Sequence, residues 1–149
     1  MRFDQLTVKG AEAVQVAQDL AVSSGHAQVE PLHLLSSLTR EQEGVVTPIL
    51  EKVGVRMDRL RELIDTQLGR LPRSTGGQTA LSRQLQEVLD RAEKEAIRLK
   101  DKYISTEHLL LALAEVPSDA KETLGIAGAT RDAIFAAMKD VRGNQRVDT

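Results

Sequence analysis

The fold is decided by two stretches of sequence, Glu30-Pro-Leu-His-Leu-Leu-Ser-Ser-Leu38 and Ser105-Thr-Glu-His-Leu-Leu-Leu-Ala-Leu113. They lie 75 positions apart and carry a histidine and the leucines after it in the same register. Each stretch is apolar on nearly every side, which is typical of a short helix buried between other helices. Their recurrence indicates that one structural unit is written twice along the chain.

The duplication extends well beyond these two stretches. At the offset of 75, the identical pairs are Glu12/Glu87, Ala17/Ala92, Ala21/Ala96, His33/His108, Leu34/Leu109, Leu35/Leu110 and Leu38/Leu113. After one deletion the offset becomes 74, and Leu50, Gly54, Asp58 and Gly69 match Leu124, Gly128, Asp132 and Gly143. We therefore divide one domain, residues 1–143, into repeat one (about 1–71), a turn-rich connector (72–80) and repeat two (about 81–143), and expect residues 144–149 to begin a linker.

Helical periodicity predicts four helices in each repeat. The predicted helices cover residues 7–25, 32–38, 45–53, 57–70, 82–100, 106–114, 120–127 and 131–142. Side chains suited to N-caps stand at their starts, namely Thr7, Ser82, Ser105, Ser118 and Thr130. Because four short helices cannot cover their own apolar faces, we expect an all-α fold in which the two repeats pack around a pseudo-twofold axis.

Composition excludes several classes of function. The chain has 149 residues, of which 41% are hydrophobic and 28% charged, so it can bury an ordinary core. A net charge of −2 with mixed signs, and only 2% aromatic residues, argue against nucleic-acid binding. Cysteine is absent, which excludes disulfides and thiolate metal sites. No apolar stretch is long enough for a membrane span or a signal peptide, so we expect a cytoplasmic protein without membrane contact.

The sequence shows no catalytic or cofactor-binding motif. It lacks a phosphate-binding loop, a serine elbow and paired histidines at metal-ligand spacing. His33 and His108 occupy the same position in the two repeats, where they either pair across the pseudo-twofold axis or brace a helix within their own half. We favour the second interpretation, because a unique active site is rarely written twice. A small hydrolase using Asp101, Glu107 and His108, and a purely structural packing module, are the less favoured alternatives.

Departures from the internal symmetry indicate where a function could have been added. They gather in the segment of residues 100–108, here called the junction segment, which joins the fifth and sixth predicted helices. Tyr103, the single tyrosine, faces Gln28 of repeat one, while Asp101 faces His26 and Glu107 faces Leu32. The junction segment is therefore the best candidate for a functional surface.

Several motifs together resemble a known family. They are Arg2-Phe3 followed by Leu6-Thr7, the stretch 30–35, the stretch 44–54, Leu71-Pro72, the stretch 103–113 and the closing stretch 141–147. In this order and spacing they resemble the N-terminal domain of the ClpB family of bacterial protein disaggregases. ClpA and ClpC carry related double-repeat domains.

The resemblance implies a substrate-binding domain without an enzymatic activity or cofactor of its own. It would capture exposed apolar segments of unfolded or aggregated proteins and pass them to the rest of a ClpB hexamer, an ATP-driven threading ring. Residues matching Thr7, Asp101 and Glu107 handle substrate in that family, and we add Tyr103 beside them. Arg91 and Glu95 stand where some relatives show groove-lining leucines. The alternative is an adaptor- or tag-docking domain of the ClpA and ClpC kind.

Overall fold

The computed structural model describes residues 2–74 and 77–143. A short 3-10 helix, Phe3–Gln5, precedes the first repeat. Repeat one consists of α1 (Val8–Ser23), β1 (Gln28–Val29), α2 (Pro31–Thr39), α3 (Val46–Val53) and α4 (Met57–Gly69). Repeat two consists of β2 (Ala80–Leu81), α5 (Arg83–Arg98), α6 (Thr106–Glu115), α7 (Asp119–Ile126) and α8 (Arg131–Arg142). The described residues thus confirm the predicted all-α fold of eight α-helices.

Local side-chain chemistry explains where the helices begin and end. The Thr7 hydroxyl accepts a hydrogen bond from the Gly10 amide, and Ser82, Ser118 and Thr130 cap α5, α7 and α8 in the same way. These caps satisfy backbone donors that have no partner inside the helix. At the other end of α3, Gly54 takes a φ of 105°, the left-handed conformation that glycine adopts without strain. The capping residues predicted from the sequence at these positions are confirmed.

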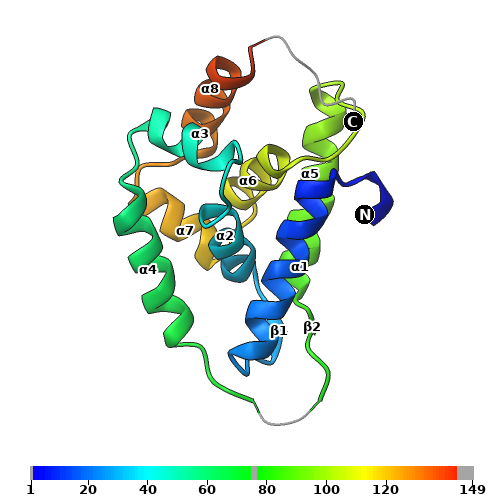
Figure 1. Ribbon diagram of the computed structural model, residues 1–149, viewed down its shortest axis with the longest axis vertical. Coiled ribbons are helices and arrows are strands. Elements are labelled where there is room, and N and C mark those ends of the chain that lie inside the picture. Colours follow the sequence, from blue (N-terminus) through cyan, green and yellow to red (C-terminus); the bar gives the residue numbers. More distant parts are fainter. Residues whose placement is uncertain (1, 75–76, 144–149) are drawn as a thin grey trace.

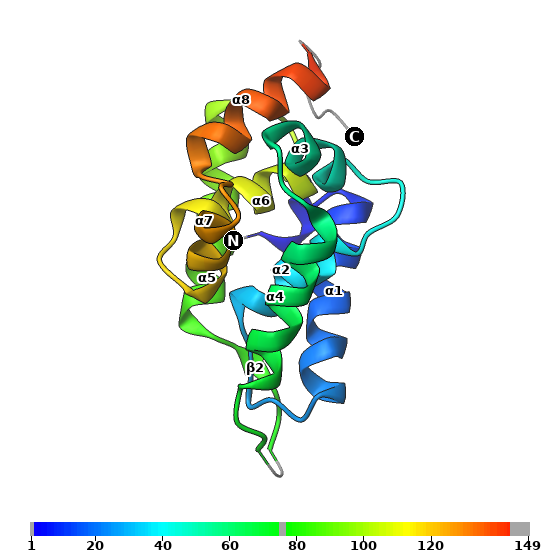
Figure 2. The ribbon, with the colours of Figure 1, turned by 90° about the vertical axis from the view of Figure 1, so that its left-hand side faces the viewer.

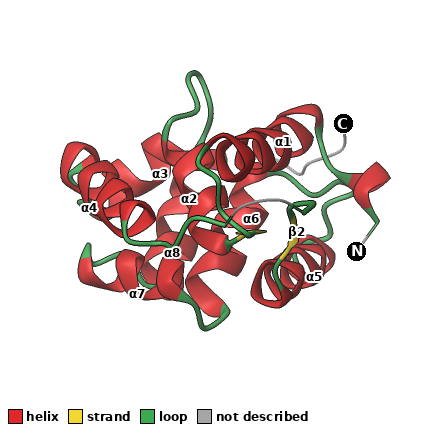
Figure 3. Cartoon of the chain, turned by 90° about the horizontal axis from the view of Figure 1, so that it is seen from below, coloured by secondary structure: helices red, strands yellow, loops and turns green. Residues whose placement is uncertain are grey.

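The centre of the molecule is formed by α2 and α6, in which every residue is buried except Glu115 at the end of α6. Figure 3 shows these two helices in the middle, with α1, α4, α7 and α5 around them. Helix α3 packs on α8, and its counterpart α7 packs on α4, so each repeat covers apolar surface of the other. In both cases the third helix of one repeat contacts the fourth helix of the other, as a pseudo-twofold arrangement requires.

Three short backbone pairings were not expected from the sequence, and one of them is an antiparallel bridge between His26 and Arg73. Strand β1 pairs in parallel with β2, which ties the end of the connector to repeat one at the end of the molecule opposite α8 (Figure 1). A single parallel bridge joins Leu6 to Ile104. Segments of one or two residues carry no periodic pattern, so sequence analysis had no signal for them.

The predicted connector is exposed over most of its described length, and residues 75–76 within it lie outside the described residues. The predicted linker at 144–149 lies outside them as well. Among the helices that the structure describes, none has the length and hydropathy needed to cross a lipid bilayer.

Candidate functional site

Backbone hydrogen bonds hold the junction segment against the start of the chain. The Thr7 amide donates to the Ile104 carbonyl at 2.9 Å, and the Ile104 amide donates to the Gln5 carbonyl at 2.9 Å. Thr7 and the junction segment were predicted to share one surface, and the structure brings them together. Val8, which follows Thr7, is 76% exposed, and Tyr103 beside Ile104 is partly exposed.

The two predicted carboxylates of the junction segment are buried in an ion-pair network with Arg142, here called the Arg142 cluster (Arg142, Asp101, Glu107 and His108). Both terminal nitrogens of Arg142 bind Asp101, at 2.5 and 2.8 Å, and Nη1 also lies 3.1 Å from Glu107 Oε2. Asp101 is 8% exposed and Glu107 7%. The hydrogen bond to Asp101 raises the pKa of Arg142 above its usual value, against the opposing effect of burial. Such two-pronged pairing suits the planar guanidinium group.

Sequence analysis did not identify Arg142 as a site residue. It lies 41 positions from Asp101 and 35 from Glu107, and no local pattern links positions so far apart. The available signal was the internal comparison at offset 74, which places Arg142 opposite the apolar Leu68. Arg142 therefore differs from its counterpart in repeat one, as Asp101 and Glu107 do.

His108 completes the cluster from inside the protein. Its Nδ1 accepts a hydrogen bond from the Ser105 amide at 2.8 Å, so in the neutral ring Nε2 carries the proton and donates to Asp101 Oδ2 at 2.7 Å. Burial lowers the pKa of His108, although the Asp101 carboxylate acts in the opposite direction. His108 therefore braces the start of α6, as the second interpretation of the histidines proposed.

The contacts of Ser105, His108 and Asp101 have the connectivity of a nucleophilic triad, because Ser105 Oγ also lies 3.0 Å from His108 Nδ1. The lone pair of Nδ1, however, already accepts the Ser105 backbone amide. In addition, Ser105 is 8% exposed and Asp101 is held by Arg142. These groups are engaged in capping α6 and in ion pairing, which leaves no free base beside an accessible hydroxyl.

Repeat one has a histidine pair in place of the Arg142 cluster. His33 Nδ1 accepts the Glu30 amide at 2.8 Å, and His33 Nε2 lies 2.8 Å from Nδ1 of His26, the counterpart of Asp101. Burial, together with the charge of His26, lowers the pKa of His33 to about 4. Each buried histidine thus has its partner within its own repeat. In the part of the chain that the structure describes, no three His, Cys, Asp or Glu side chains are grouped to hold a metal ion.

The predicted groove residues on α5 form a second ion-pair network. Glu95 is only 1% exposed and lies 2.8 Å from Arg131 and 3.3 Å from Arg91, with Arg98 at 3.5 Å. Arg91 also binds Glu115 at 3.2 Å. A hollow of about 460 Å³ lies beside Arg91, and its lining includes Lys94 and Glu115. The surface expected to be an apolar groove is therefore polar at this point.

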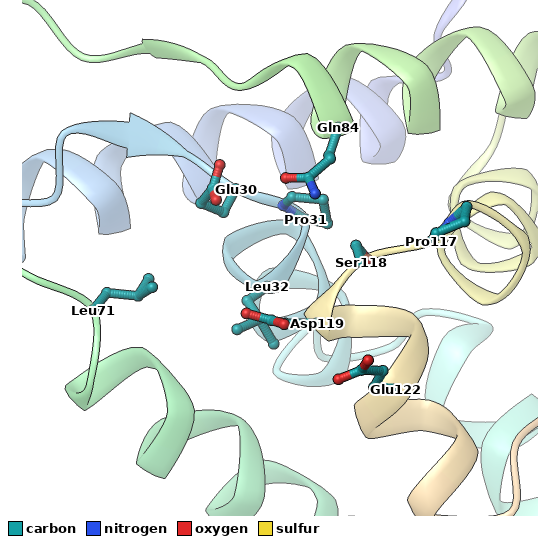
Figure 4. A pocket seen from close by; sticks show the side chains of 9 residues that line it. All are labelled: Glu30, Pro31, Leu32, Leu71, Gln84, Pro117, Ser118, Asp119 and Glu122. Atoms are coloured by element: carbon teal, nitrogen blue, oxygen red, sulfur yellow. The ribbon is translucent and has the colours of Figure 1, made fainter.

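Another hollow, of about 290 Å³, lies where the two repeats meet. Figure 4 shows Glu30, Asp119 and Glu122 around it, with Leu32 and Leu71 on the side of repeat one. The residues predicted to bind substrate do not line it. It is thus separate from the junction segment.

Comparisons with known proteins agree with this architecture. Residues 5–126 match the Clp repeat (R) N-terminal domain. The chain is 40% identical over 147 residues to the chaperone protein ClpB of Rhodopirellula baltica, covering 98% of this chain and 17% of that protein. The chain thus spans about 17% of the length of this curated relative.

Solved structures show the same fold. The Hsp104 N-terminal domain from Candida albicans superposes with a TM-score of 0.87 at 25% identity, covering 97% of this chain and 96% of that one. The ClpV N-domain in a complex with a VipB peptide has a TM-score of 0.77 at 20% identity, covering 96% and 90%, and shows the fold alone. The chain therefore belongs to the Clp repeat (R) N-terminal domain family, in the form found in ClpB- and Hsp104-like chaperones.

Proposed function

We propose that this domain weakly captures exposed apolar segments of unfolded or aggregated proteins, which the remainder of a ClpB-type disaggregase then threads. The observation that carries the proposal is the Leu6–Ile104 bridge, which brings together two backbone segments that carry exposed or partly exposed apolar side chains. Val8 is 76% exposed, Phe3 is 51% exposed, and Tyr103 is partly exposed. We call Phe3, Val8 and Tyr103 the client surface.

The client surface has the size expected for reversible capture. A few exposed apolar side chains bind an extended segment weakly, and they do not give the free domain a large exposed apolar patch that would promote aggregation. Retention of a client would then depend on several copies of the domain in one assembly, because linked weak sites act together. Binding through several weak sites favours unfolded chains over folded proteins, because an unfolded chain offers many equivalent apolar segments.

Most of the other residues of the proposed site act on the client surface indirectly. Thr7 caps α1 directly before Val8, and the Arg142 cluster immobilises Asp101 and Glu107 on either side of Tyr103. Arg91 and Glu95 shape the polar surface of α5. We propose positioning roles for Thr7, Asp101, Glu107 and Glu95, and direct client contact for Tyr103. The partly exposed Arg91 would make an additional polar contact outside the client surface. In this proposal the domain uses no cofactor and works in the cytoplasm.

A matched pair of substitutions on α1 tests the client surface. Val8→Ser removes an apolar side chain from that surface, whereas Val22→Ser removes one that is 63% exposed at the opposite end of the same helix. Loss of most of one valine contact costs about 1 kcal/mol, so we expect Val8→Ser to weaken binding of reduced, carboxymethylated lactalbumin roughly fivefold. Val22→Ser should bind like the parent chain in the same titration. Equal affinities of the two variants would contradict the proposal.

Amide chemical-shift mapping distinguishes the two kinds of partner. With the unfolded lactalbumin, the perturbed amides should cluster around Val8 and Tyr103. If the perturbed amides cluster on another face, the client binds that face and the proposed client surface is wrong. If only folded adaptor proteins perturb the spectrum, the adaptor-docking alternative replaces client capture.

A further inference from the structure

Arg142 connects the end of α8 to the client surface. It is the last residue of that helix, and Gly143 directly after it ends the helix with a φ of 62°. Its guanidinium group is mostly buried and binds Asp101 and Glu107, which lie on either side of Tyr103 and Ile104. The Ile104 backbone in turn holds Thr7, directly before Val8. The end of α8 is therefore linked to the client surface by two sets of hydrogen bonds, one at Arg142 and one at Ile104, which the short backbone of the junction segment joins.

The pseudo-twofold comparison shows that this connection is specific to repeat two. At the corresponding positions of repeat one, Leu68 stands for Arg142, His26 for Asp101 and Leu32 for Glu107. Repeat two thus has an ion-pair cluster at the positions where repeat one has two leucines and a histidine. The core of repeat one is closed without such a cluster, because Leu68 and Leu32 are buried there. Packing of the end of the fourth helix thus does not require charges.

Helix α8 is held to repeat two at both of its ends. Its first residue, Arg131, binds Glu95 on α5, and its last residue binds the junction segment. Figure 2 shows α8 lying across one end of the molecule beside α3, with α6 beneath it. The two ends differ in their partners, because the Arg142 end contacts the junction segment, which carries Tyr103, whereas the Arg131 end contacts α5.

We infer that Arg142 is a positioning residue that couples client binding to the state of the last turn of α8. When the Arg142 cluster is formed, the turn is docked and the junction segment is held in place for the client. When it is broken, the turn detaches and the junction segment loosens. A client that binds the ordered surface favours the docked state, and the remainder of a ClpB relative follows this turn in the chain. The inference rests on the proposed client surface.

Hydrogen exchange of two amides measures the coupling. The Gly143 amide, bonded to the Lys139 carbonyl, reports on the last turn, and the Thr7 amide, bonded to the Ile104 carbonyl, reports on the junction segment. Saturating unfolded lactalbumin should slow exchange of both amides about fivefold or more, which is the usual lower range of coupling between sites. Slowing at Thr7 without slowing at Gly143 would overturn the coupling but leave the proposed function standing. If neither amide responds, the client surface itself is wrong.

A variant that removes all the charges of the ion pairs assigns the coupling to the Arg142 cluster. Arg142→Gln alone leaves two buried carboxylates without their cation and can unfold the chain. The triple change Asp101→Asn, Glu107→Gln and Arg142→Gln keeps the shapes of the two acidic side chains and removes all the charges, with an amide in place of the guanidinium group. In this triple variant, client binding should no longer slow Gly143 exchange, and client affinity should fall by the same factor, because coupling is reciprocal.

Lys139→Gln is the matched control, since it removes a positive charge from the same last turn of α8, and this side chain contacts Phe135 and not the Arg142 cluster. It should retain the response of Gly143 to client. Arg142→Lys, which keeps the charge but cannot bind two oxygens side by side, should respond partially. A triple variant that binds client and protects Gly143 like the parent chain would overturn the inference.

Discussion

At the residue scale, three substitutions between the repeats convert one buried environment into another. Repeat one pairs His33 with His26, and repeat two pairs His108 with Asp101, which then requires the cation of Arg142. The two repeats share one hydrogen bond. In each, a backbone amide donates to the histidine Nδ1 at the start of a central helix. The matched histidines therefore belong to the scaffold. The unmatched residues distinguish the two surfaces.

The histidine pair of repeat one makes stability depend on pH. His33 has a pKa of about 4 in the folded chain against 6.5 unfolded, so between these values the unfolded state binds more protons. Stability is therefore lost as pH falls from about 6.5 towards 4. At pH 5 the loss from His33 amounts to about 2 kcal/mol relative to pH 7.5.

His33→Gln tests this dependence by urea unfolding at pH 7.5 and 5.0. Glutamine at this position still accepts the Glu30 amide as in a capping box, so the variant should fold. We expect it to be less stable at pH 7.5, with a loss on acidification that is about 2 kcal/mol smaller than in the parent chain. Because His108 titrates in the same direction, some dependence remains. An equal loss of unfolding free energy between pH 7.5 and 5.0 in both proteins would contradict the assignment to His33.

At the element scale, the helix ends follow from local chemistry. Predicted and observed bounds agree within a few residues at each helix, and the last predicted helix, 131–142, coincides with α8. A helix depends on its own side-chain spacing and on caps only three residues away, so these signals are readable in one sequence. Two glycines in different backbone conformations test this account.

Gly54 and Gly125 should respond to alanine with opposite signs. An added Cβ meets nothing within 4 Å at either position, so only the backbone conformation decides the effect. Gly54→Ala forces a side chain into a φ of 105° and should lower the free energy of unfolding by about 1 kcal/mol. Gly125→Ala, inside α7, should raise it by about 0.5–1 kcal/mol. Thermal and urea unfolding of the two variants measure both signs, and equal signs would contradict the conformational explanation.

At the scale of the whole molecule, the two repeats depend on each other. Helices α3 and α8 pack together across the repeat boundary, as do α4 and α7, and α2 contacts α6 at the centre. Buried side chains of α3 such as Ile49 and Leu50 therefore lose much of their cover if repeat two is removed. Neither repeat has a core that closes on its own.

A chain of residues 1–74 should accordingly fail to fold alone. We expect a weak helical circular dichroism signal and no cooperative thermal transition, because short isolated helices are marginal in water. The complete chain should unfold in a single transition under the same conditions. A cooperative transition of the fragment would show that repeat one is an independent unit.

The sequence by itself determined the duplication, the number and limits of the helices, their caps, and the positions where the repeats differ. These features are local or compare one copy with the other, so they need no knowledge of packing. Only the tertiary structure decided that Arg142 meets Asp101 and Glu107 across 41 and 35 positions, that β1 pairs with β2, and that Glu95 is buried among arginines. Which charges meet depends on where the pseudo-twofold packing places the ends of α8, and that placement results from the whole core.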